Sequence, residues 1–213
     1  MKKTVILIQT RVKSTRLPKK CLLPVEDKLL VEHVIERLKR ASIPDEILMC
    51  TSTHPDDQIL VEIARKNNIG WSAGSEEDVL ERFLQAAEES RADVVVRTTG
   101  ENPLVDPYCL DRAVQEHLES GAEYTSMDGF PAGVKAEVID VAALKKAHHL
   151  AGNPDKSEYM TLYFKDDFFR VHSIKAEGYL QRPSYRLTVD TPEDMELIRT
   201  IYQALYQPGE IIP

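Results

Sequence analysis

A ten-residue segment near the start of the chain concentrates positive charge. Its basic residues are Arg11, Lys13, Arg16, Lys19 and Lys20. The whole chain is acidic, with a formal net charge of −8 at pH 7, so this charge is a local feature. Because clustered arginine and lysine side chains bind phosphate oxygens, we interpret residues 11–20 as a loop that holds a strongly anionic ligand, with a nucleoside triphosphate as the first candidate. The alternative is a solvated loop whose cations pair with surface acids.

Two carboxylates are expected at the same edge of the fold as this loop. Glu101 follows a valine-rich run at 93–96, and Gly100 permits a tight or positive-φ turn before it. Asp190 follows a predicted strand at 185–189. Magnesium binds oxygen ligands and takes few protein carboxylates beside a phosphate, so this pair could hold such an ion. Alternatively, Glu101 is only a turn residue, and Asp190 is an accessory acid at the start of the next helix.

Strand and helix patterns alternate through the first 120 residues. Continuous apolar runs predict buried strands at 5–8, 46–50 and 93–96. Apolar residues at helical spacing predict a helix at 30–38 and a second that begins near Ile59 and ends at Asn67–Gly70. A third helix is expected to begin with Ser75 as its N-cap, and a fourth to begin at Asp106–Pro107. This order predicts an α/β fold with a mainly parallel sheet and helices on both faces. Ligands bind at the carboxyl ends of such strands, which is where the basic loop begins.

The second half of the chain departs from this alternation. We expect helices at 140–151 and 155–164, strands at 168–171 and 185–189, and a final helix capped by Thr191–Asp194. We therefore divide a single domain into a core, residues 1–122 and 184–207, and a small inserted subdomain at about 123–183.

Composition argues against several other classes of protein. The 213 residues suit one domain, and no apolar run approaches the length of a membrane span. We expect a soluble cytoplasmic protein with no membrane contact. One basic loop on an acidic chain argues against a nucleic-acid partner. Cys21, Cys50 and Cys109 lack metal-ligand spacing and are expected to be reduced, buried thiols. The chain has neither a Walker loop nor a dinucleotide-binding glycine motif.

Four ordered segments resemble the cytidylyltransferase family that makes CMP-activated sugars, most closely its spore-coat polysaccharide cytidylyltransferase-like branch. The segments are Ile8–Lys20, Gly74–Phe83, Thr99–Pro107 and Thr188–Asp194. The likeness runs over nearly the whole chain. It implies a three-layer α/β/α fold like that of nucleotide-diphospho-sugar transferases, with CTP and Mg²⁺ as ligands. It also implies a homodimer formed through the middle region.

The resemblance further implies an activity and a set of residue roles. The activity is transfer of CMP from CTP to a sugar acid or a related small hydroxylated or phosphorylated acceptor, with release of pyrophosphate. Nucleotide contacts are expected from Arg11, Ser14, Arg16, Lys20 and Arg97. Glu101 and Asp190 would hold the metal, and Lys20, Arg11 and Asp190 would act in catalysis. Acceptor contacts are expected from Glu137 and Tyr159.

Departures from the family pattern keep two rival functions open. Glu101 stands where the family usually has aspartate, Lys13 and Lys19 stand where glycine is usual, and Tyr159 stands where histidine is common. One rival is a noncatalytic nucleotide-binding or assembly subunit on the same fold. The other is a glycosyltransferase, although the turn at Gly100–Asn102 lacks the Asp-x-Asp metal motif that such enzymes normally need.

Overall fold

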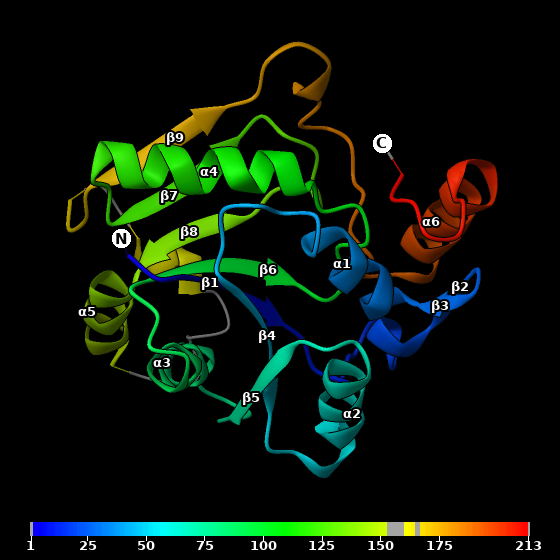
Figure 1. The fold of residues 1–213 in the computed structure, drawn as a ribbon, viewed down its shortest axis with the longest axis horizontal. Coiled ribbons are helices and arrows are strands. Elements are labelled where there is room, and N and C mark those ends of the chain that lie inside the picture. Colours follow the sequence, from blue (N-terminus) through cyan, green and yellow to red (C-terminus); the bar gives the residue numbers. More distant parts are fainter. Residues whose placement is uncertain (1, 153–159, 165–166, 213) are drawn as a thin grey trace.

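A seven-stranded sheet forms the middle layer of the protein (Figure 1). The computed structural model describes residues 2–152, 160–164 and 167–212. In spatial order the strands are β5 (Gly70–Gly74), β4 (Glu46–Ser52), β1 (Thr4–Gln9), β6 (Val94–Thr99), β8 (Glu137–Asp140), β7 (Tyr124–Asp128) and β9 (Val171–Lys175). Among these strands only β8 runs antiparallel to its neighbours, while the other neighbouring pairs are parallel. The expected mainly parallel sheet is confirmed.

Helices cover both faces of this sheet, so the fold has three layers. One face carries α1 (Leu30–Leu38), α2 (Gln58–Lys66) and α4 (Pro107–Ser120), and the other carries α3 (Val79–Glu89) and α5 (Val141–Ala151). Side chains of β1 alternate between the layers: Ile6 and Ile8 pack toward the first set, and Val5 and Leu7 pack toward the second. All four are fully buried, as a central parallel strand requires. Within the described residues, no helix is both long and apolar enough to cross a membrane.

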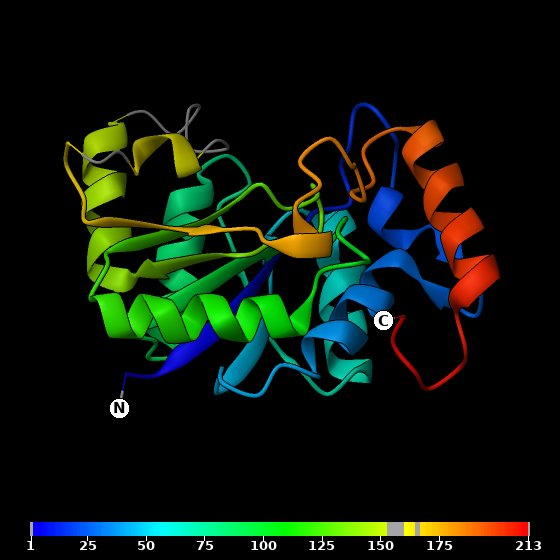
Figure 2. The same cartoon turned by 90° about the horizontal axis from the view of Figure 1, so that it is seen from above.

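A third buried cluster joins two distant parts of the chain beside the sheet. The last helix, α6 (Pro192–Leu205), packs there near the short hairpin of β2 (Pro24–Val25) and β3 (Lys28–Leu29), at one end of the molecule in Figure 2. Its fully buried members include Leu30, Val189 and Ile198. The residues that follow the basic loop and those that flank Asp190 therefore share one core, and burial of this apolar surface holds them together.

The middle of the chain adds three strands to the same sheet. The segment expected as an insertion contains β7, β8 and β9 together with α5. Much of the helix predicted at 155–164 lies outside the described residues, and residues 160–163 form a 3₁₀ turn. The strand predicted at 168–171 begins only at Val171, because Phe169 packs into the core beneath α3 and α5 instead of entering the ladder.

The strand predicted at 185–189 is wrong. This segment forms only an isolated bridge between Arg186 and Ala132, with Leu187 N donating to the Ala132 carbonyl at 2.7 Å. Two residues later, Val189 N donates to the carbonyl of Glu101 at 2.9 Å. Because successive backbone donors go to two different loops, no continuous ladder forms. The segment instead links the turn after β6 to the loop after β7.

The three cysteines are free and buried, as predicted. Burial raises the pKa of Cys21 to about 11 and the pKa values of Cys50 and Cys109 to about 12. These thiols are therefore protonated at neutral pH, and a protonated thiol is a poor nucleophile.

Gly133 allows two backbone segments to touch. Its φ is +94°, and a Cβ at this position would lie 2.5 Å from the carbonyl carbon of Leu187. A side chain here would push the 185–189 segment, and Asp190 after it, away from the sheet.

We expect Gly133→Ala to destabilise the protein by about 1–3 kcal/mol more than Gly121→Ala, because overpacking adds to backbone strain. Gly121 is the matched control: its φ is also positive, +64°, but a Cβ there would meet no atom within 4 Å. Gly121→Ala should cost only the left-handed strain, about 1–2 kcal/mol. Chemical unfolding of both variants measures the difference, and equal losses would contradict the proposed contact.

Candidate functional site

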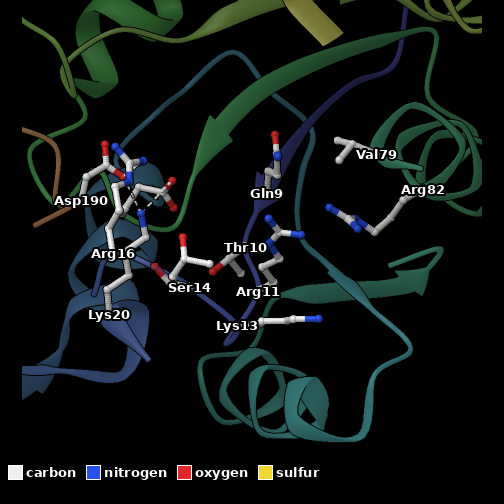
Figure 3. Close-up of a pocket in the computed structure, with 12 residues that line it drawn as sticks. Gln9, Thr10, Arg11, Lys13, Ser14, Arg16, Lys20, Val79, Arg82 and Asp190 are labelled. Carbon is white, nitrogen blue, oxygen red and sulfur yellow. Dashed lines mark hydrogen bonds and ion pairs between the residues drawn. The ribbon is translucent and has the colours of Figure 1, made fainter. Parts of the chain in front are cut away.

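A cavity of about 150 Å³ opens at the carboxyl ends of β1 and β6 (Figure 3). It is lined by Gln9, Thr10, Arg11, Lys13, Ser14, Thr15, Arg16, Lys20, Val79, Arg82, Glu101 and Asp190. Five of these side chains are basic and two are acidic, so a ligand in the cavity meets an excess of positive charge. The basic loop therefore forms a positively charged wall of this cavity, although Lys13 and Arg16 also pair with Glu76 and Asp190 and stay partly exposed.

One ammonium group joins two carboxylates at one end of this cavity. Lys20 Nζ lies 2.7 Å from Asp190 Oδ1 and 3.4 Å from Glu101 Oε1. The lysine is buried, with only 9% of its surface exposed. The sequence predicted that the loop and the two acids meet, and the structure brings them together. We call this group of three residues the Lys20 centre.

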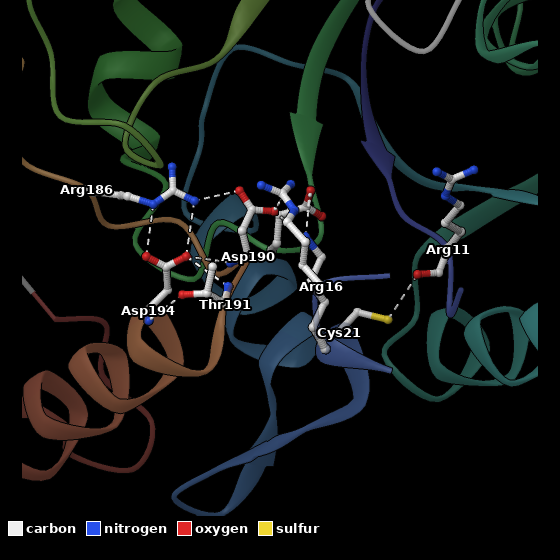
Figure 4. Close-up of polar contacts among 9 residues, drawn as sticks. Arg11, Arg16, Cys21, Arg186, Asp190, Thr191 and Asp194 are labelled. Carbon is white, nitrogen blue, oxygen red and sulfur yellow. Dashed lines mark hydrogen bonds and ion pairs between the residues drawn. The ribbon is translucent and has the colours of Figure 1, made fainter. Parts of the chain in front are cut away.

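Asp190 is held from both sides by arginines, as Figure 4 shows. Arg16 Nη2 donates to Asp190 Oδ1 at 2.9 Å, and Arg186 Nη2 donates to Oδ2 at 2.6 Å. Arg186 also binds Asp194, with Nε 2.9 Å from Oδ1 and Nη2 3.1 Å from Oδ2. The sequence did not single out Arg186, although its spacing of four and eight residues from the two acids was visible. Its planar donor fork fixes the orientation of the Asp190 carboxylate.

The start of α6 supports the same carboxylate through its cap. The predicted cap at Thr191 is confirmed: its hydroxyl accepts from Asp194 N at 3.3 Å. In return, Asp194 Oδ2 accepts from the backbone N–H groups of Asp190 and Thr191, at 2.8 and 3.0 Å. This reciprocal capping box anchors the backbone on which Asp190 sits.

The two acids of the Lys20 centre have opposite pKa shifts. Burial raises the pKa of Glu101, and although Lys20 opposes this effect, the nearby charge of Asp190 reinforces it. Burial would also raise the pKa of Asp190, but hydrogen bonds from Lys20 and Arg186 outweigh it, so the pKa is lowered. The surroundings of Asp190 therefore favour its charged form, whereas burial disfavours the charged form of Glu101.

Buried groups beneath the basic loop set its shape. The N–H of Val12 donates to Asp57 Oδ1 at 2.7 Å, and Cys21 Sγ donates to the Arg11 carbonyl at 3.5 Å. Lys19 has φ of +57°, the left-handed region that favours glycine. Local sequence pattern did not predict the anchor at Asp57, because that buried carboxylate lies more than forty residues away in the chain.

Gly100 is needed for close approach rather than for unusual dihedral angles. It is not among the residues with positive φ, so that part of the expectation is wrong. A Cβ at Gly100 would lie 2.6 Å from Thr10 Oγ1. The turn that presents Glu101 therefore packs directly on Thr10, the residue before the basic loop.

The start of α3 differs from the sequence prediction. Asp78, not Ser75, is the N-cap, because its carboxylate accepts from Glu81 N at 3.0 Å. Ser75 Oγ instead accepts from Asp78 N at 3.1 Å and supports the preceding turn. Arg82, which the sequence pattern did not single out, lines the cavity although it is 1% exposed. The sequence did hold a signal for Arg82, because an arginine three residues after Val79 falls on the buried stripe of the helix.

A second cavity, of about 200 Å³, is lined in part by Asn102, which follows Glu101 of the first cavity in the chain. Its lining includes Arg97, Asn102, Lys135, Glu137 and Thr188. Arg97 forms an ion pair with Glu137 and donates through Nε to Gln9 Oε1 of the first cavity at 2.9 Å. Arg97, expected beside the nucleotide, thus lies between the two cavities and lines the second. Tyr159 falls outside the described residues.

The donor set of the Lys20 centre suits a hard cation. Within the described residues, no group of three or more histidine, cysteine, aspartate or glutamate side chains could bind a metal alone. Two carboxylates that share one ammonium group are nevertheless enough for Mg²⁺, which takes its remaining ligands from phosphates and water. The residues therefore fit a magnesium ion that arrives together with a phosphorylated ligand.

Known proteins share both the sequence pattern and the fold. A profile of the family described as "Cytidylyltransferase" matches residues 5–209. The spore coat polysaccharide biosynthesis protein SpsF of Bacillus subtilis (strain 168) is 34% identical over 210 residues, covering 95% of this chain and 88% of that protein. Among solved structures, a cytidylyltransferase from Leptospira borgpetersenii serovar Hardjo-bovis (strain JB197) has a TM-score of 0.91 and 29% identity, over 100% of this chain and 91% of the other.

A second solved structure extends the likeness of fold. CMP:2-keto-3-deoxy-manno-octonic acid synthetase, complexed with CTP, has a TM-score of 0.71 and 18% identity, over 95% of this chain and 99% of the other. The expected three-layer architecture is thus shared with proteins of low sequence identity.

The bonds to Asp194 predict a pH dependence of stability. Arg186 and the backbone N–H groups of Asp190 and Thr191 outweigh burial and lower the pKa of Asp194 from 3.8 to about 2. A lowered carboxyl pKa stabilises the fold above pH 3.8, and this contribution is lost as the pH falls toward 2. Asp194→Asn should therefore cost about 2 kcal/mol at pH 7 and almost nothing near pH 2.

Urea unfolding of wild type and Asp194→Asn across this pH range measures the effect. Glu196→Gln, an exposed acid on the same helix, is the control and should change stability little at any pH. If Asp194→Asn lowers the free energy of unfolding by the same amount at every pH, the lowered pKa of Asp194 is contradicted.

Proposed function

Because the chain belongs to the cytidylyltransferase family, we propose that its first cavity binds CTP and that the protein transfers the cytidylyl group to a sugar acid or a related small hydroxylated acceptor. The observation that carries this proposal is the Lys20 centre, where a basic loop and two carboxylates converge on one ammonium group. A triphosphate bound together with a metal ion needs both kinds of group.

The basic loop would bind the triphosphate. Arg11, Ser14 and Arg16 line the cavity and carry donors suited to phosphate oxygens. The acceptor oxygen forms a bond to the α-phosphorus while the bond to the β-phosphate oxygen breaks, and pyrophosphate leaves. Such a reaction needs positioning and charge neutralisation more than covalent help from the protein. These residues would supply both.

Glu101 and Asp190 would hold Mg²⁺, which supplies positive charge beside the phosphates when bound. Lys20 Nζ lies between the two carboxylates, so it has to release at least one of them. We infer that the ammonium group then turns to the phosphate oxygens. The lowered pKa of Asp190 makes its carboxylate a stronger candidate for ion binding than for proton abstraction near neutral pH.

The second cavity is the proposed acceptor site. Lys135 and Arg97 place positive charge there, as a carboxylated acceptor requires, while Glu137 could accept hydrogen bonds from hydroxyl groups. The Tyr124 hydroxyl donates to Glu137 at 2.7 Å and holds it in place. The hydrogen bond from Arg97 to Gln9 links this cavity to the one proposed for CTP.

Removing either proposed metal ligand should abolish metal-dependent turnover. We expect Asp190→Asn and Glu101→Gln to lower the rate of pyrophosphate release from CTP by roughly 10²–10³, the usual scale for a lost electrostatic contact. Release would be measured with Mg²⁺ and a panel of sugar acids. Glu119→Gln, an exposed change in the last turn of α4, is the control and should keep full activity.

Two outcomes would contradict this proposal. Unchanged turnover in Asp190→Asn would remove the metal assignment. Saturable CTP binding by the wild type without pyrophosphate release on any acceptor would favour a noncatalytic nucleotide-binding subunit.

Lys20→Met tests whether Mg²⁺ can replace the ammonium group between the two carboxylates. Without the ammonium group between them the two carboxylates repel more strongly, even though Arg16 and Arg186 still bind Asp190, so stability should fall by on the order of 2 kcal/mol. Mg²⁺ should restore much of this loss in Lys20→Met while raising the Tm of the wild type less. Lys175→Met is the matched control, since its pair with Asp128 is exposed and should contribute under about 1 kcal/mol. Equal responses of wild type and Lys20→Met to Mg²⁺ would count against the inferred exchange.

A further inference from the structure

Arg82 is a buried cation with an incomplete set of partners. It is 1% exposed, yet its side chain lines the first cavity. Its Nη1 donates to the carbonyls of Ser75 and Glu76, at 2.6 and 3.5 Å. Its buried Nε has no hydrogen-bond partner among the described residues, and no carboxylate in that part of the chain pairs with the guanidinium. Because an unsatisfied buried donor is costly, the arrangement favours an acceptor that arrives with a ligand.

The position of Arg82 indicates which part of a ligand it would meet. Figure 3 shows Arg82 and Val79 at one end of the cavity and Lys20 and Asp190 at the other. Under the proposed function, the carboxylate end takes the metal and the phosphates, because the two carboxylates among the described lining residues, Glu101 and Asp190, meet there. The nucleoside must then extend toward Arg82, beside the apolar side chain of Val79.

We propose that Arg82 reads the nucleobase by donating hydrogen bonds to the acceptor edge of cytosine. This inference rests on the proposed binding of CTP. Cytosine presents O2 and N3 as neighbouring acceptors, and a guanidinium carries only donors. Uracil has an N–H group at position 3, which would face an arginine donor and leave both unpaired. Arg82 is therefore a specificity-determining residue that favours CTP over UTP.

A purely structural role explains only part of this arrangement. The bonds from Nη1 to Ser75 and Glu76 brace the turn before α3, and that bracing needs one nitrogen of the three. It does not account for a charged group that borders the cavity with a buried donor unpaired. A lysine-like point charge would suffice for attraction of phosphate, whereas a planar donor group suits a planar base.

The test compares CTP with 3-deaza-CTP, in which a C–H group replaces the N3 acceptor. Dissociation constants would be measured by calorimetry for wild type, Arg82→Met and the control Arg112→Met. Arg112 is a partly exposed arginine on α4 that pairs with Glu116. We expect the wild type and the control to bind 3-deaza-CTP roughly tenfold more weakly than CTP, the loss of one charged hydrogen bond. Arg82→Met should bind the two nucleotides equally and should also lose the preference for CTP over UTP.

Three results would overturn the inference. Equal affinity of the wild type for CTP and 3-deaza-CTP does so even if Arg82→Met fails to fold. If a folded Arg82→Met protein still binds 3-deaza-CTP tenfold more weakly than CTP, then Arg82 only braces the turn before α3. If Arg82→Met binds CTP, UTP and pyrophosphate more weakly by the same factor, and the ratio of its dissociation constants for 3-deaza-CTP and CTP is unchanged, then Arg82 contacts a phosphate. Failure of the wild type to bind CTP at all would instead refute the proposed function.

Discussion

The architecture of the first cavity depends on one shared ammonium group. Lys20 comes from the basic loop, Glu101 from the turn after β6, and Asp190 from the segment before α6, and all three meet within hydrogen-bond or ion-pair distance. Like charges repel, so the ammonium group between the two partly buried acids stabilises their approach, and Arg16 and Arg186 add positive charge at Asp190. Under the proposed function, a divalent ion would take over the role of the ammonium group and leave it free to bind phosphate.

Distant backbone contacts bring the three residues into place. Val189 bonds to the carbonyl of Glu101, and Gly133 lets the segment before Asp190 lie against the loop after β7. Arg186 then orients the Asp190 carboxylate against the cap of α6. The shared core of α6 and the β2–β3 hairpin holds the far end of this assembly. Changes in any of these supports should therefore alter the cavity without touching a ligand.

The sequence predicted elements best where apolar periodicity was strong and continuous. The central strands and the helices at 30–38 and 141–151 were found at nearly the expected residues. The edge strand β5 was missed, because its sequence, Gly70–Gly74, is short and carries an exposed tryptophan. The segment at 185–189 has the alternation of a strand, yet its hydrogen bonds go to two loops. Local pattern reports which side chains can be buried, but not which backbone partner is available.

The sequence by itself determined which chemical groups the chain carries and where they fall along it. These are a cluster of cations after the first strand, two carboxylates at later strand or helix ends, and the ordered segments that resemble one family. Only the tertiary structure decided that Lys20 binds both acids, that Arg97 turns toward a second cavity, and that Arg82 is buried at the far end of the first. Residue type and local pattern are properties of short stretches of chain. The distances between Lys20, Glu101 and Asp190 depend instead on contacts across as many as 170 positions, which exist only after the sheet and its cores have formed.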